Sequence, residues 1–323
     1  MKKTWYNKIG MLFIGTAAGC ILSLFWGFTN DDVVQKERPL VSSMSVTPTT
    51  PYQISFCGQT IDLKRYERHE ALDRELTSFS YLHATTMLLI KRANRYFPII
   101  EPILEANGIP DDFKYLAVIE SNLDQRAVSP AKAAGFWQFM PQTAKQYGLT
   151  ITTSVDERFH VEKATNAACR YLKDAYKKYN DWVSVAASYN AGMGRISGEL
   201  EKQAAGSALD LWLVEETSRY VYRILAIKQI FENPYKYGFI LESDDLYKPI
   251  RFQKVETKDI PDLSEFAKQH GITYADLKRF NPWLKERKLQ SFGKIYTIDV
   301  PLKEDLYYEA GTVKVHNPAW VVK

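Results

Sequence analysis

The chain has 323 residues, of which 46% are hydrophobic and 25% are charged. This composition is typical of a folded globular protein and excludes both wholesale disorder and a protein with many membrane spans. The 42 Lys and Arg residues exceed the 38 Asp and Glu residues by only four, so the charge gives no reason to expect a nucleic-acid partner. The three cysteines and five histidines show no metal-ligand spacing, and we expect neither a metal nor another cofactor.

Residues 9–28 carry no charge, and this is about the length that a helix needs to cross a membrane. Lysines precede the segment and aspartates follow it, which predicts a cytoplasmic N-terminus and an exported body. We therefore expect residues 1–29 to be a membrane anchor or signal segment. Residues 17–20 resemble the lipobox of bacterial lipoproteins, so lipidation at Cys20 or signal cleavage stays open. Either way the predicted location is the periplasmic side of the cell envelope, with an inner-membrane helix favoured over a lipoprotein.

A flexible linker is predicted over residues 30–59, because this stretch is rich in Ser, Thr and Pro and lacks periodicity. From 60 to 240 the apolar residues recur at helical spacing and almost never alternate, which predicts a mainly helical domain. The clearest predicted stripes are Leu72, Leu76 and Phe79; Leu88, Leu89, Arg92 and Tyr96; and Val161, Ala164, Thr165, Ala168, Leu172 and Ala175. The last stripe predicts that the neighbouring Cys169 is buried.

One predicted helix begins near Pro110 and carries an unusual carboxylate. Its apolar stripe of Phe113, Leu116 and Ala117 reaches Glu120 at the next position. Burial of a carboxyl group favours its protonated form, and a general acid needs that form. The structural alternative is a glutamate that pairs with an arginine or reaches solvent at the end of the helix. Glu120 is therefore the candidate catalytic acid.

Four short segments follow Glu120 and its neighbour Ser121. They are Ser129-Pro130, the run GFWQFMP at 135–141, the run SYNAG at 188–192 and the run ETSRYV at 216–221. Tryptophans 137, 182 and 212 are expected in the core more often than on a sugar-binding surface. Only Trp137, within the second segment, is as readily expected in a cleft.

A second, smaller module is predicted over residues 250–302. Strand patterns at 251–255 and 294–300 enclose two helical patterns at 263–269 and 274–280, which gives the order β-α-α-β. Residues 303–323 suggest only a tail.

Taken together, the motifs around Glu120 resemble the soluble lytic transglycosylase catalytic domain of glycoside hydrolase family 23. The most similar branch is that of membrane-bound lytic murein transglycosylase D. The resemblance implies a lysozyme-like helical domain that acts on peptidoglycan. Residues 251–301 are similar to a LysM peptidoglycan-binding repeat, but residues 257–262 replace its usual Gly-Asp-Thr, which leaves sugar binding by the module open.

The resemblance also implies roles for individual residues. Glu120 would protonate the oxygen between N-acetylmuramic acid and N-acetylglucosamine, and would then act as the base on the C6 hydroxyl to give a 1,6-anhydro product. Tyr189 would orient the carboxyl group of Glu120 by a hydrogen bond. The other implied substrate-binding residues are Ser129, Gln138, Met140, Asn190 and Tyr220.

The acids near Glu120 bear on the reaction type. A conventional glycosidase needs a second carboxylate across the bond, and the only acid close in sequence is Asp124, one helical turn away. Such a neighbour would lie beside Glu120 and not opposite it, which favours a one-acid mechanism. A goose-lysozyme-like hydrolase and a non-catalytic wall-binding protein remain alternatives. Peptidoglycan strands and the membrane are the expected partners, and no protein partner is predicted.

Overall fold

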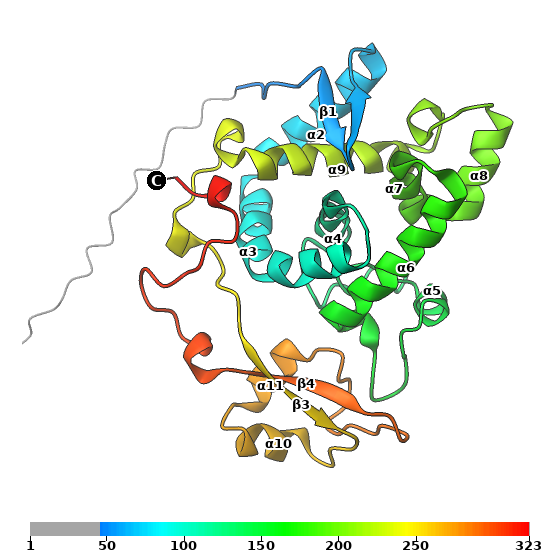
Figure 1. Cartoon of the computed structure of the whole chain (residues 1–323). Coiled ribbons are helices and arrows are strands. Elements are labelled where there is room, and N and C mark those ends of the chain that lie inside the picture. The colour runs from blue at the N-terminus through cyan, green and yellow to red at the C-terminus, as the bar shows by residue number, and fades with distance from the viewer. Residues whose placement is uncertain (1–45, 323) are drawn as a thin grey trace, which may run out of the picture. The chain divides into compact units, whose positions relative to one another are not determined.

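The structure is a computed structural model, and it describes residues 46–322 (Figure 1). The membrane segment predicted at 9–28, the lipobox-like residues and most of the predicted linker lie outside the described residues. Within 46–322 no helix is both long and apolar enough to cross a membrane.

The described chain contains short strands at both ends of a series of helices. The strands are β1 (Gln53–Phe56), β2 (Gln59–Asp62), β3 (Phe252–Thr257) and β4 (Tyr296–Pro301). The helices are α2 (Tyr66–Tyr81), α3 (His83–Ala106), α4 (Lys114–Ser121), α5 (Pro141–Gln146), α6 (Val161–Tyr179), α7 (Trp182–Ala191), α8 (Met193–Lys202), α9 (Glu215–Glu232), α10 (Leu263–Gln269) and α11 (Tyr274–Phe280). Single 3-10 turns, among them Asp111–Phe113 and Glu157–Phe159, join several of them.

The mainly helical character predicted for residues 60–240 is confirmed, because α2 to α9 lie in this stretch. Helix α2 buries the three apolar residues predicted for it. In α3 the buried face is one position away from the prediction: Ile90 and Phe97 are fully buried, whereas Leu88 is exposed. The run of apolar residues 88–90 fits either face, so periodicity alone does not fix the orientation of this helix.

Helix α9 forms the centre of the helical part. It packs against α2, α4 and α7, and Figure 1 shows it crossing the end of α4. Its middle is buried on all sides, since Ile224, Leu225, Ala226 and Ile227 are each fully enclosed. A helix that is apolar all round belongs inside a protein. Residues on α9 that face α4 are therefore held rigidly.

The helical part begins earlier than predicted. Strands β1 and β2 pair antiparallel through a two-residue turn, in which Cys57 and Gly58 have φ angles of 52° and 79°. Ile54 and Phe56 of β1 are buried in the core of the helical part. The linker prediction over 30–59 is therefore wrong for its last residues. Four-residue strands give too little alternation to be recognised in the sequence.

The small module has the predicted β-α-α-β order. Strands β3 and β4 pair antiparallel with Phe252 opposite Pro301, and helices α10 and α11 lie between them in sequence. Asp262 caps α10, and Thr273 forms a reciprocal capping box with Asp276 at the start of α11.

The module shares an apolar cluster with the helical part. Val155 and Phe159 belong to the same cluster as Trp283 and Leu284 of the module. Beside them, the backbone N–H of Asp156 donates to the carbonyl of Trp283 at 2.8 Å. The segment between α5 and α6 therefore anchors the module through both apolar contacts and backbone hydrogen bonds.

The last residues return to the helical core. Trp320 is 3% exposed, its ring centroid lies 5.8 Å from those of Phe97 and Phe231, and its Nε1 donates to the Phe231 carbonyl at 2.9 Å. The N–H of Val322 donates to the Leu241 carbonyl at 2.9 Å. The prediction that 303–323 is only a tail is therefore wrong. The apolar residues near Trp320 recur at neither helical nor strand spacing, so no periodicity reveals its burial.

Replacing Trp320 by alanine is expected to lower the free energy of unfolding by about 3–5 kcal/mol, because it empties a buried site of that size. Urea unfolding of the full chain measures the change. The matched control is Trp212→Ala: Trp212 was predicted in the core but is 89% exposed, so its loss should change stability by less than about 0.5 kcal/mol. Equal effects of the two substitutions would contradict the described packing.

Candidate active site

Glu120 lies in the last turn of α4. The helix ends where Asn122 takes a left-handed conformation with φ 54°, and its N–H donates to the Val118 carbonyl at 2.9 Å. The residues that precede Glu120 on this short helix, from Tyr115 to Ile119, are buried. The sequence therefore places a partly buried carboxyl group at the end of a rigid apolar helix.

The carboxyl group of Glu120 has one direct hydrogen-bond partner among the described residues. The hydroxyl of Tyr220, on α9, donates to Glu120 Oε1 at 2.5 Å. Burial is the largest effect and raises the pKa of Glu120 to about 7, and the negative charge of Glu216 also raises it. The hydrogen bond from Tyr220 and the positive charge of Arg223 act in the opposite direction. Near neutral pH both protonation states are therefore populated, so one residue can give and accept a proton. Within residues 46–322, no arginine forms an ion pair with Glu120, which was the structural alternative.

Tyr189 lies beside this pair but bonds elsewhere. Its hydroxyl donates to the carbonyl of Trp137 at 2.8 Å, so Tyr220 makes the hydrogen bond that was expected from Tyr189. Burial raises the pKa of Tyr189 well above its ordinary value, and the negative charge of Glu120 raises it further. The two tyrosines and Glu120 thus form one cluster, in which Tyr220 donates to the carboxyl group and Tyr189 donates to the Trp137 carbonyl.

The segment with Ser129 and Gln138 forms one closed loop. Gln138 has a φ of 45°, and its Nε2 donates to the carbonyls of Gly135 at 2.9 Å and Ala127 at 3.2 Å. Ser129 Oγ accepts from the N–H of Ala133 at 3.0 Å. These bonds hold the loop together, and none of them joins Ser129 or Gln138 to Glu120. Their roles as substrate-binding residues remain predictions.

Two other predicted residues lie at the ends of the neighbouring helices. Asn190 Oδ1 accepts from the hydroxyl of Thr217 at 3.0 Å, which ties the end of α7 to the start of α9. This bond brings the segments 188–192 and 216–221 together. Met140 is 44% exposed and directly precedes α5.

A buried arginine that the sequence analysis missed braces the loop. Arg158 Nη1 donates to the carbonyls of Lys132 at 2.7 Å and Phe139 at 3.0 Å, and its Nη2 pairs with Asp156 at 2.8 Å. Burial of a charge requires such compensation. The only sequence signal was an acid two residues before an arginine, which is too common to single out.

Trp137, left open between core and cleft, is fully buried and donates through Nε1 to Thr165.

Asp124, the acid closest to Glu120 in sequence, is not the carboxylate that acts on Glu120 in the structure. Asp124 lies beyond the end of α4, where its Oδ1 accepts from the N–H of Arg126 at 2.9 Å, so it is not a helical neighbour of Glu120. Instead α9 contributes Glu216, an exposed residue whose charge acts on Glu120.

Residues 46–322 contain no cluster of His, Cys, Asp and Glu that could hold a metal ion. Cys57 and the buried Cys169 are both free thiols.

Two family models and several known proteins match parts of this chain. Residues 98–210 match the transglycosylase SLT domain, and residues 253–304 match the soluble lytic transglycosylase C-terminal LysM-like domain. Membrane-bound lytic murein transglycosylase D of Escherichia coli K12 is 32% identical over 239 residues, which cover 72% of this chain and 51% of the relative. The chain therefore spans about half the length of this relative.

Two further similarities are shorter. Peptidoglycan transglycosylase gp16 of Escherichia phage T7 is 31% identical over 136 residues, which cover 41% of this chain and 10% of that protein. The 70 kDa soluble lytic transglycosylase of Escherichia coli superposes with a TM-score of 0.37 at 25% identity, over 44% of this chain and 24% of that one. By the matches to the two family models, the chain contains a transglycosylase SLT domain over residues 98–210 and a soluble lytic transglycosylase C-terminal LysM-like domain over residues 253–304.

Proposed function

We propose that this chain is a lytic transglycosylase that cleaves the glycan strands of peptidoglycan. The observation that carries the proposal is the Glu120 carboxyl group, which is bonded to Tyr220 and has a pKa of about 7, within an SLT domain. The names of the similar proteins, murein and peptidoglycan transglycosylases, support the substrate class. A binding protein without activity has no need of a buried acid poised at neutral pH.

The proposed reaction uses Glu120 twice. The protonated carboxyl first gives its proton to the oxygen that joins C1 of N-acetylmuramic acid to N-acetylglucosamine, and the C1–O bond breaks with its electron pair on that oxygen. The resulting carboxylate then takes the proton of the C6 hydroxyl of the same muramic acid, whose oxygen bonds to C1. The product carries a 1,6-anhydro ring, no water is consumed, and Glu120 ends protonated as it began. A pKa near neutrality suits an acid that must also serve as a base.

The remaining predicted residues would position the sugar. We assign Tyr189 and Asn190 to the side of the cleft formed by the end of α7, and Ser129, Gln138 and Met140 to the side formed by the loop before α5. The loop bonds of Gln138 and the Asn190–Thr217 bond support this assignment, because they hold both side chains on rigid elements.

The rate of cleavage should fall as the pH rises above about 7, because Glu120 must be protonated to act as the acid and loses its proton there. Tyr220→Phe removes a hydrogen bond that lowers this pKa. The variant should therefore be slower, with the alkaline limb of its pH profile moved to higher pH. Rates measured between pH 5 and 9 check the shift. A limb that stays in place or moves to lower pH would contradict the described bond.

The LysM-like module is proposed to hold the enzyme on the wall. A shallow pocket of about 440 Å³, lined by Asp259, Pro261, Leu289 and Phe292 among others, lies between the segments before α10 and before β4. The ring of Phe292 is 78% exposed, which offers a face for stacking on a sugar. With such a substrate, the expected location is the periplasmic side of the cell envelope, as the membrane-bound relative also suggests.

A peptidoglycan hydrolase that resembles goose lysozyme is the second candidate. The observation in its favour is Glu216, because a carboxylate brought near Glu120 by the fold could activate a water molecule.

Digestion of purified sacculi tests the proposal. The full chain, solubilised in detergent, is incubated with sacculi, and the released muropeptides are identified by mass spectrometry. Fragments that end in 1,6-anhydro-N-acetylmuramic acid are the expected result. Sacculi that bind the protein but release no fragments would favour a binding protein instead.

A further inference from the structure

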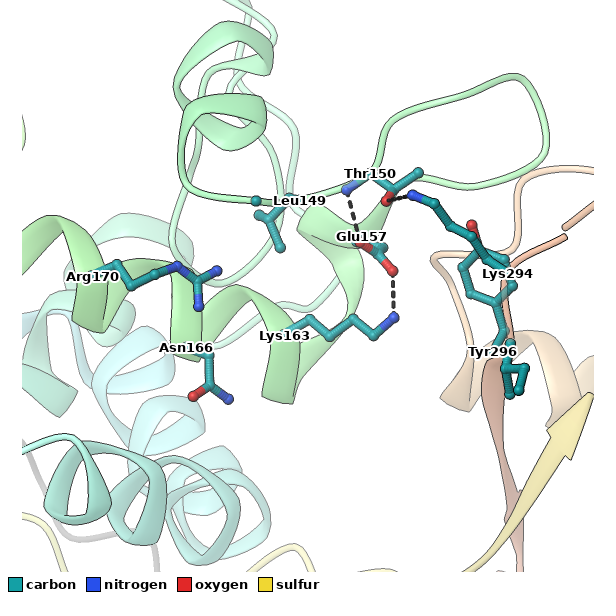
Figure 2. Close-up of a pocket in the computed structure, with 10 residues that line it drawn as sticks. Leu149, Thr150, Glu157, Lys163, Asn166, Arg170, Lys294 and Tyr296 are labelled. Carbon is teal, nitrogen blue, oxygen red and sulfur yellow. Dashed lines mark hydrogen bonds and ion pairs between the residues drawn. The ribbon is translucent and has the colours of Figure 1, made fainter. Parts of the chain in front are cut away.

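A pocket of about 320 Å³ lies between the helical part and the module, and Glu120 is not among the residues that line it (Figure 2). One wall is formed by Lys163, Asn166 and Arg170, which lie on the same face of α6 at helical spacing. The other walls come from the turn that follows α5 and from Lys294 to Tyr296 at the start of β4. The pocket is therefore built by both domains.

The charges that line this pocket are unequal. Three cations, Lys163, Arg170 and Lys294, face a single carboxylate, Glu157. Glu157 is already satisfied: it pairs with Lys163 and accepts from the N–H of Thr150 at 2.7 Å. Figure 2 shows these bonds along the wall of the pocket. The lining as a whole is therefore positive.

Two of the cations have only neutral partners within the described part of the chain. Lys294 Nζ donates to the hydroxyl of Thr150 at 3.2 Å, and Arg170 Nε donates to the carbonyl of Tyr147 at 3.1 Å. Figure 2 shows Arg170 and Lys294 on opposite sides of the pocket. Arg170 keeps donors beyond these bonds, since a guanidinium group has five and a lysine has three. An anionic ligand would meet two separate, uncompensated cations.

The pocket lies close to the proposed catalytic cleft. The ring of Tyr189 packs on Tyr171 with centroids 5.1 Å apart, and Tyr171 packs on Tyr147 at 5.4 Å. The carbonyl of Tyr147 is the group that Arg170 contacts. Two ring contacts thus separate Tyr189 from the pocket. An extended peptide of four residues spans roughly 14 Å, so a peptide attached to a sugar in the cleft can reach well beyond the cleft.

We propose that this pocket binds the carboxylates of the peptide stem that is attached to the muramic acid in the cleft. The inference rests on the proposed function, because the stem is the acidic part of peptidoglycan. Arg170 and Lys294 each pair with one carboxylate, while Leu149, Ile295 and the ring of Tyr296 contact the apolar parts of the peptide. The module thereby takes part in choosing the substrate, since it supplies Lys294.

Calorimetric titration of the full chain tests the proposal without any cleavage. The probes are a stem tetrapeptide with free carboxylates, the same peptide with its carboxylates amidated, and inorganic phosphate. The free peptide should bind, and loss of either cation, in Arg170→Gln or Lys294→Gln, should weaken binding about tenfold. Lys294→Arg keeps the charge and should retain most of the affinity. The matched control is Lys177→Gln, a 77% exposed lysine on α6 outside the pocket, which should bind like the parent.

Three results would overturn the inference: equal binding of the amidated peptide, unchanged binding by the double variant that combines Arg170→Gln with Lys294→Gln, or binding of phosphate without binding of the peptide. A second readout separates this inference from the proposed function. The parent should prefer sacculi with intact stems over strands stripped by an amidase, and the double variant should lose that preference. Cleavage of neither substrate would contradict the proposed function, while the titration would still decide whether the pocket binds the peptide.

Discussion

Replacing Glu120 by glutamine is expected to lower the rate of glycan-strand cleavage by at least about a thousandfold, because one group supplies both proton transfers. Glutamine keeps the shape of the side chain and can still accept the hydrogen bond of Tyr220. The fold should therefore be unchanged, which circular dichroism checks. The measurement is the initial rate of muropeptide release from sacculi.

Two other substitutions make this result specific. Glu105→Gln alters an exposed acid at the end of α3 and should leave the rate as it was. Glu216→Gln removes the second carboxylate near Glu120, and a one-acid mechanism predicts a decrease of less than about tenfold. A loss at Glu216 as large as that at Glu120 would show two catalytic carboxylates and would contradict the one-acid account.

Replacing Gly135 by alanine is expected to lower the free energy of unfolding by more than about 3 kcal/mol, or to prevent folding at 37 °C. Gly135 has a φ of +76°, and a Cβ at this position would lie 1.9 Å from the carbonyl oxygen of Arg158. The atoms of Arg158 that the Cβ would meet are backbone atoms, which cannot rotate away as a side chain can, so the clash requires the loop to move. Arg158 also holds this loop through the carbonyls of Lys132 and Phe139, and cleavage should fall together with stability.

The control for this substitution is Gly198→Ala in α8. A Cβ there meets no atom within 4 Å, and the residue is helical. Alanine is the better helix former, so stability should stay equal or rise by about 0.5–1 kcal/mol. Thermal unfolding of both variants gives the comparison. A Gly135→Ala protein as stable as the parent would show that the loop does not approach Arg158 so closely.

The elements around Glu120 could be predicted because each has a strong local signal. Glu120 interrupts an apolar stripe, and the side chain of Asp181 caps α7 by accepting from two N–H groups. In the module, the helices have capping residues and the strand β4 has alternating burial. The stripe on α6 is buried as predicted except for Val161, which is half-buried. Local rules were sufficient where an apolar stripe was unambiguous, but not in α3, where the run of apolar residues 88–90 fits either face.

The features that were missed depend on contacts between distant segments. The hydrogen bond of Tyr220 to Glu120 spans 100 positions in sequence, and that of Trp320 to Phe231 spans 89. The brace at Arg158 relies on left-handed and loop conformations that no periodicity encodes. Trp212 looked like a core residue by type alone and is exposed. Residue type and spacing cannot specify which long-range partner a side chain meets.

In the proposed reaction one carboxyl group breaks the glycosidic bond, and the muramic acid itself, and no water molecule, closes the reaction. Digestion of sacculi by the full chain in water enriched in heavy oxygen distinguishes this reaction from hydrolysis, with the released muropeptides weighed by mass spectrometry. Fragments that end in 1,6-anhydro-N-acetylmuramic acid and carry no heavy oxygen are the expected result. Reducing muramic acid ends that carry heavy oxygen at C1 would contradict it and would make the protein a hydrolase.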